Sequence, residues 1–216
     1  MPRYRQDERE NALAATRQRL LQAAVQEFAR LGYAETNINR VSEAAGLSKG
    51  TIYNYFASKR ELMLAVLRQT AEEHIAAIAE QVKAETDSVC RLLRFFEAGF
   101  AFVERHPAQT KVMITTLYGS DTALNEYIFR LYQPMFQLVD TEILASGMEQ
   151  GSFRQVDPAS TSTLLMTIYL GTAAQVDENG KPYLDPAQVA DFAARALHNE
   201  SSRTAAGLIE TCAGRS

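Results

Sequence analysis

The side chains best suited to chemistry gather between residues 49 and 56, in the segment KGTIYNYF. If this segment is helical, Ile52 and Phe56 lie one turn apart and point inward together. The opposite side carries hydroxyl groups, an amide and almost no bulk, from Gly50, Thr51, Tyr53 and Asn54. Groups of this kind hydrogen-bond to phosphates and to base edges. The pattern therefore predicts a contact with nucleic acid.

Two short helices joined by a tight turn, over residues 37–56, would position these side chains. Asn37 caps the first helix, because a short side-chain acceptor satisfies free backbone N–H groups there. One apolar face follows at the i, i+3 and i+7 positions, made by Ile38, Val41 and Ala45. Gly46 ends this helix in a left-handed conformation, and Ser48 caps a second helix over 49–56. The arrangement is that of a helix-turn-helix, whose second helix enters the major groove.

Composition and charge agree with a globular protein that has one basic end. The 216 residues are 46% hydrophobic and 22% charged, which is typical of a soluble domain with a sizeable core. Residues 1–60 hold 10 basic and 6 acidic side chains, whereas residues 61–216 hold 12 and 20. The net charges are therefore +4 and −8. A basic head on an acidic body is expected where only the head approaches phosphates.

Several other classes of protein are disfavoured. The charged N-terminus does not read as a secretion signal, and no apolar run reaches membrane-spanning length. Cys90 and Cys212 form no CxxC pair, so we expect free thiols in a reducing cytoplasm rather than a disulfide framework or a zinc site. The three histidines lack metal-ligand spacing, and we find no nucleophile–base pair or phosphate loop. We therefore expect no metal, no cofactor and no enzymatic activity.

Helical spacing covers nearly the whole chain, and no segment alternates as a strand does. The sequence predicts an all-α fold of about nine helices, three in an N-terminal helix-turn-helix domain and six in a ligand-binding and dimerisation domain. The remaining helices are expected at about 16–31, 58–82 (opened by the capping box Ser58-x-x-Glu61), 88–105, 107–118, 121–148, 158–176 and 186–198. The expected domains are 1–57 and 58–200, followed by a mobile tail at 201–216.

The head of the chain resembles the tetracycline-repressor (TetR) family of bacterial transcriptional regulators. The resemblance covers roughly residues 16–66 and rests on AAVQEFARLGY (23–33) and AAGLSKGTIYNYFASKREL (44–62). The body agrees with the family in organisation, including Gly147-x-x-x-Gly151-x-Phe153-Arg154 before Asp157-Pro158. Asn37 departs from the more usual Ser or Thr, but it caps a helix equally well.

The resemblance implies a homodimer that binds a palindromic DNA operator through the head. The helices at about 158–176 and 186–198 would form the dimer interface, although the small residues around Gly171 also suit a tight crossing within one chain. The implied DNA-facing positions are Thr36, Ser48, Lys49, Gly50, Thr51, Tyr53, Asn54, Tyr55 and Lys59. Among them Tyr53 and Lys59 would hold phosphates. Thr51 and Asn54 would read bases, since an Asn side chain pairs bidentately with adenine.

The body is rich in aromatic side chains, which permit two interpretations. They can be ordinary core, or some can line a pocket for a small apolar or aromatic effector such as an acyl thioester. The candidate lining residues are Phe95, Phe96, Phe100, Met113, Tyr118, Tyr127, Tyr132, Phe136 and Tyr169. The leading hypothesis is a repressor released by this effector. The alternative is a helix-turn-helix protein controlled by a protein partner, which predicts a solid core with an exposed apolar patch.

Overall fold

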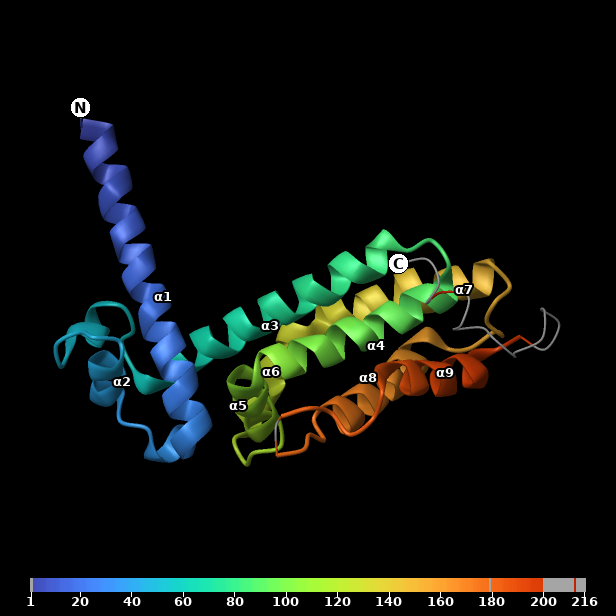
Figure 1. Ribbon diagram of the computed structural model, residues 1–216. Coiled ribbons are helices and arrows are strands. Elements are labelled where there is room, and N and C mark those ends of the chain that lie inside the picture. Colours follow the sequence, from blue (N-terminus) through green and yellow to red (C-terminus); the bar gives the residue numbers. More distant parts are fainter. Residues whose placement is uncertain (1, 179, 200–211, 213–216) are drawn as a thin grey trace. The chain divides into compact units, whose positions relative to one another are not determined.

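The computed structural model describes residues 2–178, 180–199 and 212, and its regular elements are helices (Figure 1). In chain order they are α1 (Pro2–Glu35), α2 (Ile38–Ala44), the 3₁₀ turn η1 (Thr51–Asn54), α3 (Lys59–Ala84), α4 (Ser88–Arg105), α5 (Pro107–Leu117), α6 (Thr122–Leu138), the π-helical segment η2 (Val139–Ala145), α7 (Ser146–Glu149), α8 (Pro158–Ala173) and α9 (Pro186–Leu197). The predicted all-α fold is confirmed. None of these helices is long and apolar enough to cross a membrane.

The chain divides into two compact units. The first unit comprises Met1–Thr70 and Ala108–Ile128, and the second comprises Ala71–Pro107 and Phe129–Ser216. Helices α3 and α6 each begin in the first unit and end in the second. Both units therefore share two continuous helices.

Side-chain caps begin α2, α3, α8 and α9, whereas the cap predicted from Ser48 does not form, because Gly50 precedes η1 without a side-chain cap. Asn37 accepts a hydrogen bond from the backbone N–H of Asn39 at 2.9 Å, ahead of α2. The Glu61 N–H donates to Ser58 Oγ at 3.1 Å at the start of α3. Caps of the same kind precede α8 and α9, from Asp157 and Asp185. These bonds satisfy N–H groups that have no partner within the helix.

Helix α1 is longer than the predicted helix at about 16–31, because it begins at Pro2. The segment NALAA (11–15) consists mostly of strong helix formers and contains no glycine or proline that would end a helix. Gly32 interrupts α1 with φ +78°, directly after the end predicted at about residue 31. A left-handed backbone at this point is available to glycine at little cost.

The second element of the helix-turn-helix differs from its prediction. An α-helix over 49–56 is expected, but the structure has the four-residue 3₁₀ turn η1. Gly50 precedes it with φ +83°, which breaks the α-helical path. The N–H groups of Thr51 and Tyr53 accordingly donate to carbonyls three residues earlier, at 3.1 Å each. The polar face is therefore displayed from a tight turn.

The helix predicted over 121–148 is continuous but changes type along its length. It starts as α6, widens into the π-helical segment η2 at Val139, and returns to α-helix in α7. π-Helical segments are often found at functional sites. In this chain, η2 packs against α4 and α8. Both ends of this helix lie close to the predicted ones. Its start is fixed by Asp121, which caps the first turn by accepting a hydrogen bond from the Leu124 N–H.

Each unit has its own buried core. In the first unit an apolar stripe of α1 is buried with apolar residues of α2 and η1, namely Leu20, Leu21, Ala24, Phe28, Val41 and Ile52. In the second unit α4 packs against α8, α9 and η2. Helix α4 is apolar on most of its sides, as in a helix buried within a core, and Phe95, Phe96, Phe100 and Phe102 are all buried.

Candidate nucleic-acid interface and effector domain

The turn η1 exposes its polar residues while its apolar residue anchors it. Ile52 is fully buried, whereas Tyr53 is 51% exposed and Asn54 is also exposed. The hydroxyl oxygens of Ser48 and Thr51 lie 2.7 Å apart at the start of the turn. This geometry displays a phenol and an amide on a rigid support, which suits hydrogen bonding to DNA.

Ser42 fixes η1 on α2, and sequence reasoning missed this role. The backbone N–H of Ile52 donates to Ser42 Oγ at 3.1 Å, and Ser42 is completely buried. The bond satisfies an N–H that the short 3₁₀ turn leaves unpaired. In the sequence, this role is indicated only by the position of the Ser42 hydroxyl directly after the apolar Val41.

Two further predicted DNA-facing residues flank η1. Lys49 Nζ lies 3.2 Å from Glu43 Oε1, and both side chains are largely exposed. An exposed ion pair of this kind contributes about 0–1 kcal/mol, so a phosphate can compete for the lysine. Tyr55 is half-buried directly after the turn.

Thr36, another predicted DNA-facing position, has a buried side chain. Thr36 is 3% exposed, and its hydroxyl donates to the Gly32 carbonyl at 2.7 Å. Lys59 also contributes to this corner of the first unit. Its Nζ donates to the carbonyls of Ala34 (2.8 Å) and Thr36 (3.1 Å), and it lies 4.9 Å from the centre of the Tyr33 ring. The ammonium group thus stabilises the end of α1, as cations do at helix C-termini.

The candidate effector residues are distributed over both units. Phe95, Phe96, Phe100, Tyr132 and Tyr169 are buried in the second unit, where Phe136 is half-buried. Met113, Tyr118 and Tyr127 belong to the first unit instead. Tyr118 is 73% exposed, so it does not lie in a core. The structure therefore brings together aromatic residues of α4 and α8 as one cluster, and His74 links Tyr132 of α6 to it.

A histidine lies at the centre of this cluster. His74 Nδ1 lies 2.8 Å from the Tyr132 hydroxyl, and Nε2 lies 2.8 Å from the Tyr169 hydroxyl. Tyr169 in turn donates to the Gly99 carbonyl at 3.2 Å. Because that bond uses the Tyr169 proton, Nε2 carries the histidine proton and Nδ1 accepts from Tyr132. The imidazole also stacks on Phe102, with ring centres 4.5 Å apart.

Burial keeps this network neutral. It lowers the pKa of His74 to about 4, with a smaller contribution from His106. Burial also raises the pKa of Tyr132, and it raises that of Tyr169 together with the charge of Tyr132. Near neutral pH the three groups therefore act as hydrogen-bonding groups without charge. A lone histidine on a helix gave no sequence signal for this, since its partners lie 58 and 95 residues away.

A surface groove of about 450 Å³ lies elsewhere in the second unit, between α4 and the segment 181–186. Of the predicted aromatic set, Phe100 lines this groove. Its other walls include the acidic Glu97 and Glu104 and the exposed Tyr183 and Leu184. The groove thus combines apolar surface with negative charge.

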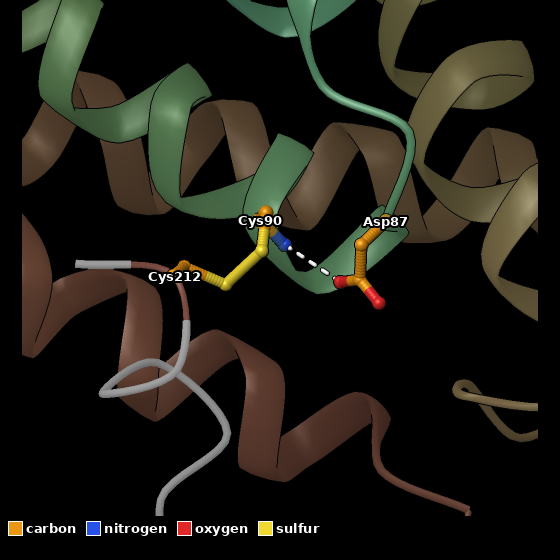
Figure 2. A group of neighbouring side chains, drawn as sticks. All are labelled: Asp87, Cys90 and Cys212. Atoms are coloured by element: carbon orange, nitrogen blue, oxygen red, sulfur yellow. Dashed lines mark hydrogen bonds between the residues drawn. A yellow bond between two sulfur atoms is a disulfide. The ribbon is translucent and has the colours of Figure 1, made fainter. Parts of the chain in front are cut away.

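The prediction that both cysteines are free thiols was wrong, because Cys90 and Cys212 form a disulfide. Figure 2 shows this bond beside Asp87, whose carboxylate accepts hydrogen bonds from the N–H groups of Val89 and Cys90. The potential ligand atoms of Asp87, Cys90 and Cys212 all lie within 4.8 Å of one another. Both sulfur atoms are occupied by the disulfide, so they are not available to a metal ion in this state. The predicted tail at 201–216 otherwise lies outside the described residues.

The capped α2, the turn Gly46–Gly50 and the exposed face of η1 define a helix-turn-helix DNA-binding protein. Residues 20–66 match the family of bacterial regulatory proteins described as the tetR family. The comparison therefore shows a DNA-binding segment of the tetR family within the first unit of this chain.

Individual relatives agree with this assignment. The HTH-type transcriptional activator FasR of Mycolicibacterium smegmatis is 36% identical over 93 residues, which are 43% of this chain and 42% of FasR. The HTH-type transcriptional repressor KstR2 of Mycobacterium tuberculosis is 28% identical over 146 residues, which are 62% of this chain and 68% of KstR2. The match with FasR therefore spans less than half of either protein.

The fold is shared with solved structures. The transcriptional regulator FadR from Bacillus subtilis, in complex with stearoyl-CoA, superposes with a TM-score of 0.73 at 19% sequence identity. The match covers 84% of this chain and 97% of that chain. At this level of identity the likeness establishes the architecture of the chain, and any common ligand is a separate question.

Proposed function

We propose that this chain is a dimeric transcriptional repressor that binds a palindromic operator and is released by a small effector. The observation that carries the proposal is the exposed face of η1, with Tyr53 and Asn54, held on α2 by the buried bond from Ile52 to Ser42. This face falls inside the segment that matches the tetR family.

The proposed DNA-binding domain is 1–57, and the proposed effector and dimerisation domain is 58–200. DNA would be contacted by Ser48, Lys49, Gly50, Thr51, Tyr53, Asn54, Tyr55 and Lys59. Thr51 and Asn54 would contact base edges. Tyr53 and Lys59 would contact phosphates, and Lys59 would do so while holding the end of α1.

Exposed apolar side chains support dimerisation through α8 and α9. Leu164 on α8 is 63% exposed and Phe192 on α9 is 65% exposed. Large apolar residues exposed together on neighbouring helices commonly mark an interface. A two-fold dimer would place two η1 turns about 34–36 Å apart, which matches one turn of DNA.

The proposed effector is an apolar or aromatic compound, with an acyl thioester as the leading candidate. The aromatic cluster of α4 and α8 supplies apolar surface, and the network around His74 supplies a few fixed polar groups. The stearoyl-CoA complex of the similarly folded FadR supports this class of compound. Effector binding would act through α3. This helix begins in the first unit, directly after the proposed DNA-binding domain, and ends in the second unit.

A protein partner in place of the small effector is the second candidate. It is favoured by the dense packing of Phe95, Phe96 and Tyr169, which are each at most 1% exposed. It is also favoured by the exposed Tyr183 and Leu184 beside the surface groove. Native mass spectrometry of the purified protein, with and without stearoyl-CoA, separates the two candidates.

The test of the proposed function starts from randomised duplex DNA, because the operator is not defined by the fold. Sequences selected by the purified protein should share one palindrome, and footprinting should protect both half-sites. Stearoyl-CoA should then abolish protection. Selection without a shared palindrome at moderate salt would refute operator binding, whereas protection unaffected by acyl-CoA compounds would refute only the effector class.

A further inference from the structure

A disulfide joins two distant parts of the second unit. Cys90 is the third residue of α4, and Cys212 follows it by 122 residues. The two Cα atoms lie 5.4 Å apart, within the range that a disulfide spans. Both residues are buried, at 5% and 2% exposure.

We propose that Cys90 and Cys212 are a reversible redox pair that hydroperoxides oxidise and dithiols reduce. The inference rests on the proposed function, because a regulator of chromosomal DNA works where thiol systems keep cysteines reduced. Disulfides that form in such a compartment are usually transient and redox-sensing rather than structural. The bond in this structure is then the oxidised state of a site that switches.

The chemistry of the switch needs only the two thiols and one hydroperoxide. One thiolate attacks the peroxide oxygen, which breaks the O–O bond, releases an alcohol or water and leaves a sulfenic acid. The second thiol attacks the sulfenic sulfur and expels water, so that two electrons pass from the thiols to the peroxide. A dithiol then reduces the disulfide by thiol–disulfide exchange, which restores both cysteine thiols and leaves the dithiol oxidised to its own disulfide.

The chain is well arranged for one defined product. It contains two cysteines in all, so no competing intramolecular pair exists. Asp87 fixes the backbone of Cys90, since its carboxylate accepts a hydrogen bond from the Cys90 N–H at 3.0 Å (Figure 2). The same carboxylate accepts a hydrogen bond from the Val89 N–H at 2.9 Å. Cys90 is therefore held in place on the capped helix α4, whether or not it is bonded to Cys212.

The disulfide lies at a junction within the second unit. Beside Cys90, the Ser88 N–H donates to Gln150, and Arg91 donates to the Glu142 carbonyl at 2.8 Å. Helix α4 also packs against α8 and α9, the helices proposed to form the dimer. Oxidation thus ties residue 212 to the helix that supports the proposed interface, and it should alter operator binding by the 5- to 150-fold that coupled sites usually show.

The experiment uses the full-length protein with hydrogen peroxide and dithiothreitol as probes. Free thiols are counted by alkylation and mass spectrometry, and binding to the selected operator is measured by fluorescence anisotropy. We expect two free thiols after dithiothreitol and none after peroxide, with at least a fivefold difference in operator affinity between the states. Cys90→Ser and Cys212→Ser should each abolish that difference. The corresponding alanine variants, Cys90→Ala and Cys212→Ala, should do the same, and they replace the serine variants if the latter fold poorly.

Three results would overturn the proposal. The first is a disulfide that persists in excess dithiothreitol while the protein is folded. The second is equal operator affinity in the two thiol states. The third is a zinc ion held one-to-one by the reduced pair with Asp87 and retained in peroxide. If no state binds DNA, the proposed function fails, while the thiol count still decides whether the pair is redox-active.

Discussion

Arg60 in the first turn of α3 and Asp121 at the start of α6 form an ion pair, with Arg60 Nη1 2.9 Å from Asp121 Oδ2. The same two helices are joined again by Arg68, whose Nε donates to the Tyr127 hydroxyl at 3.2 Å. Both contacts lie in the first unit. Because the two helices continue into the second unit, these contacts connect elements that both units share.

The ion pair should hold the pKa of Asp121 below its ordinary value. The hydrogen bond from Arg60 is the main cause that lowers the pKa of Asp121, followed by the Leu124 N–H. Stabilisation by this carboxylate is therefore present above its ordinary pKa and is lost as the pH falls through the lowered value. Arg60→Ala should move the pKa of Asp121 upward in an NMR titration. Asp157, whose lowered pKa depends on Ser160, is the matched control and should not move.

Gly99 is expected to be intolerant of a side chain. A methyl group there would lie 2.5 and 2.8 Å from ring atoms of Tyr169, which is itself held by hydrogen bonds. Gly99→Ala should therefore lower the free energy of unfolding by about 1–3 kcal/mol. Gly171→Ala is the control for packing within one chain, because nothing in the chain lies within 4 Å of its added methyl. Since α8 belongs to the proposed dimer interface, both variants are compared at a protein concentration low enough to keep the chain monomeric. Urea denaturation should find Gly171→Ala unchanged or slightly more stable, and equal effects at both positions would contradict the packing argument.

The boundaries of the helices were largely predictable, whereas the contacts that close the two units were not. Caps such as Asn37, Asp157 and Asp185 are local, so the sequence displays them directly. The 3₁₀ form of η1 depends on a tertiary bond from Ile52 to Ser42 and on the left-handed Gly50. Short apolar and polar patterns do not distinguish a 3₁₀ turn from an α-helix.

Long-range pairs were missed for the same physical reason. The disulfide joins residues 122 apart, and the absence of a CxxC pair led to the expectation of free thiols. His74 gains its partners from α6 and α8, which no periodicity links to α3. The aromatic composition of the second unit was visible, but its division between core and surface, as for the exposed Tyr118, depended on the packing of helices.

His74 should make the stability of the second unit depend on pH. Its folded-state pKa of about 4 lies below the ordinary value of 6.5, so the unfolded chain binds the proton first as the pH falls. The stabilisation is thus complete above pH 6.5 and is lost progressively toward pH 4. It amounts to roughly 3 kcal/mol at 1.36 kcal/mol per pKa unit.

The measurement is the free energy of unfolding at pH 7 and at pH 4.5, in the wild type and in His74→Gln. Carboxylates contribute the same acid sensitivity to both proteins, so the difference between them isolates the histidine. We expect the variant to lose about 2–3 kcal/mol less stability on acidification. Tyr132→Phe tests the network separately, because it removes the hydroxyl that donates to His74 while the imidazole stays buried. Parallel pH profiles for wild type and His74→Gln would show that His74 is not buried in its neutral form.

Substitutions on the exposed face of η1 should distinguish residues that contact bases from residues that contact phosphates. Asn54→Ala should cost about 1–3 kcal/mol on the selected operator and relax the preference at one base pair. Tyr53→Ala should weaken binding to all duplexes alike, because a phosphate contact carries no sequence information. Lys59→Ala should in addition destabilise the protein, since its Nζ holds the carbonyls of Ala34 and Thr36. Binding selections at two salt concentrations measure these effects, and uniform weakening by Asn54→Ala would remove Asn54 from the base-reading positions.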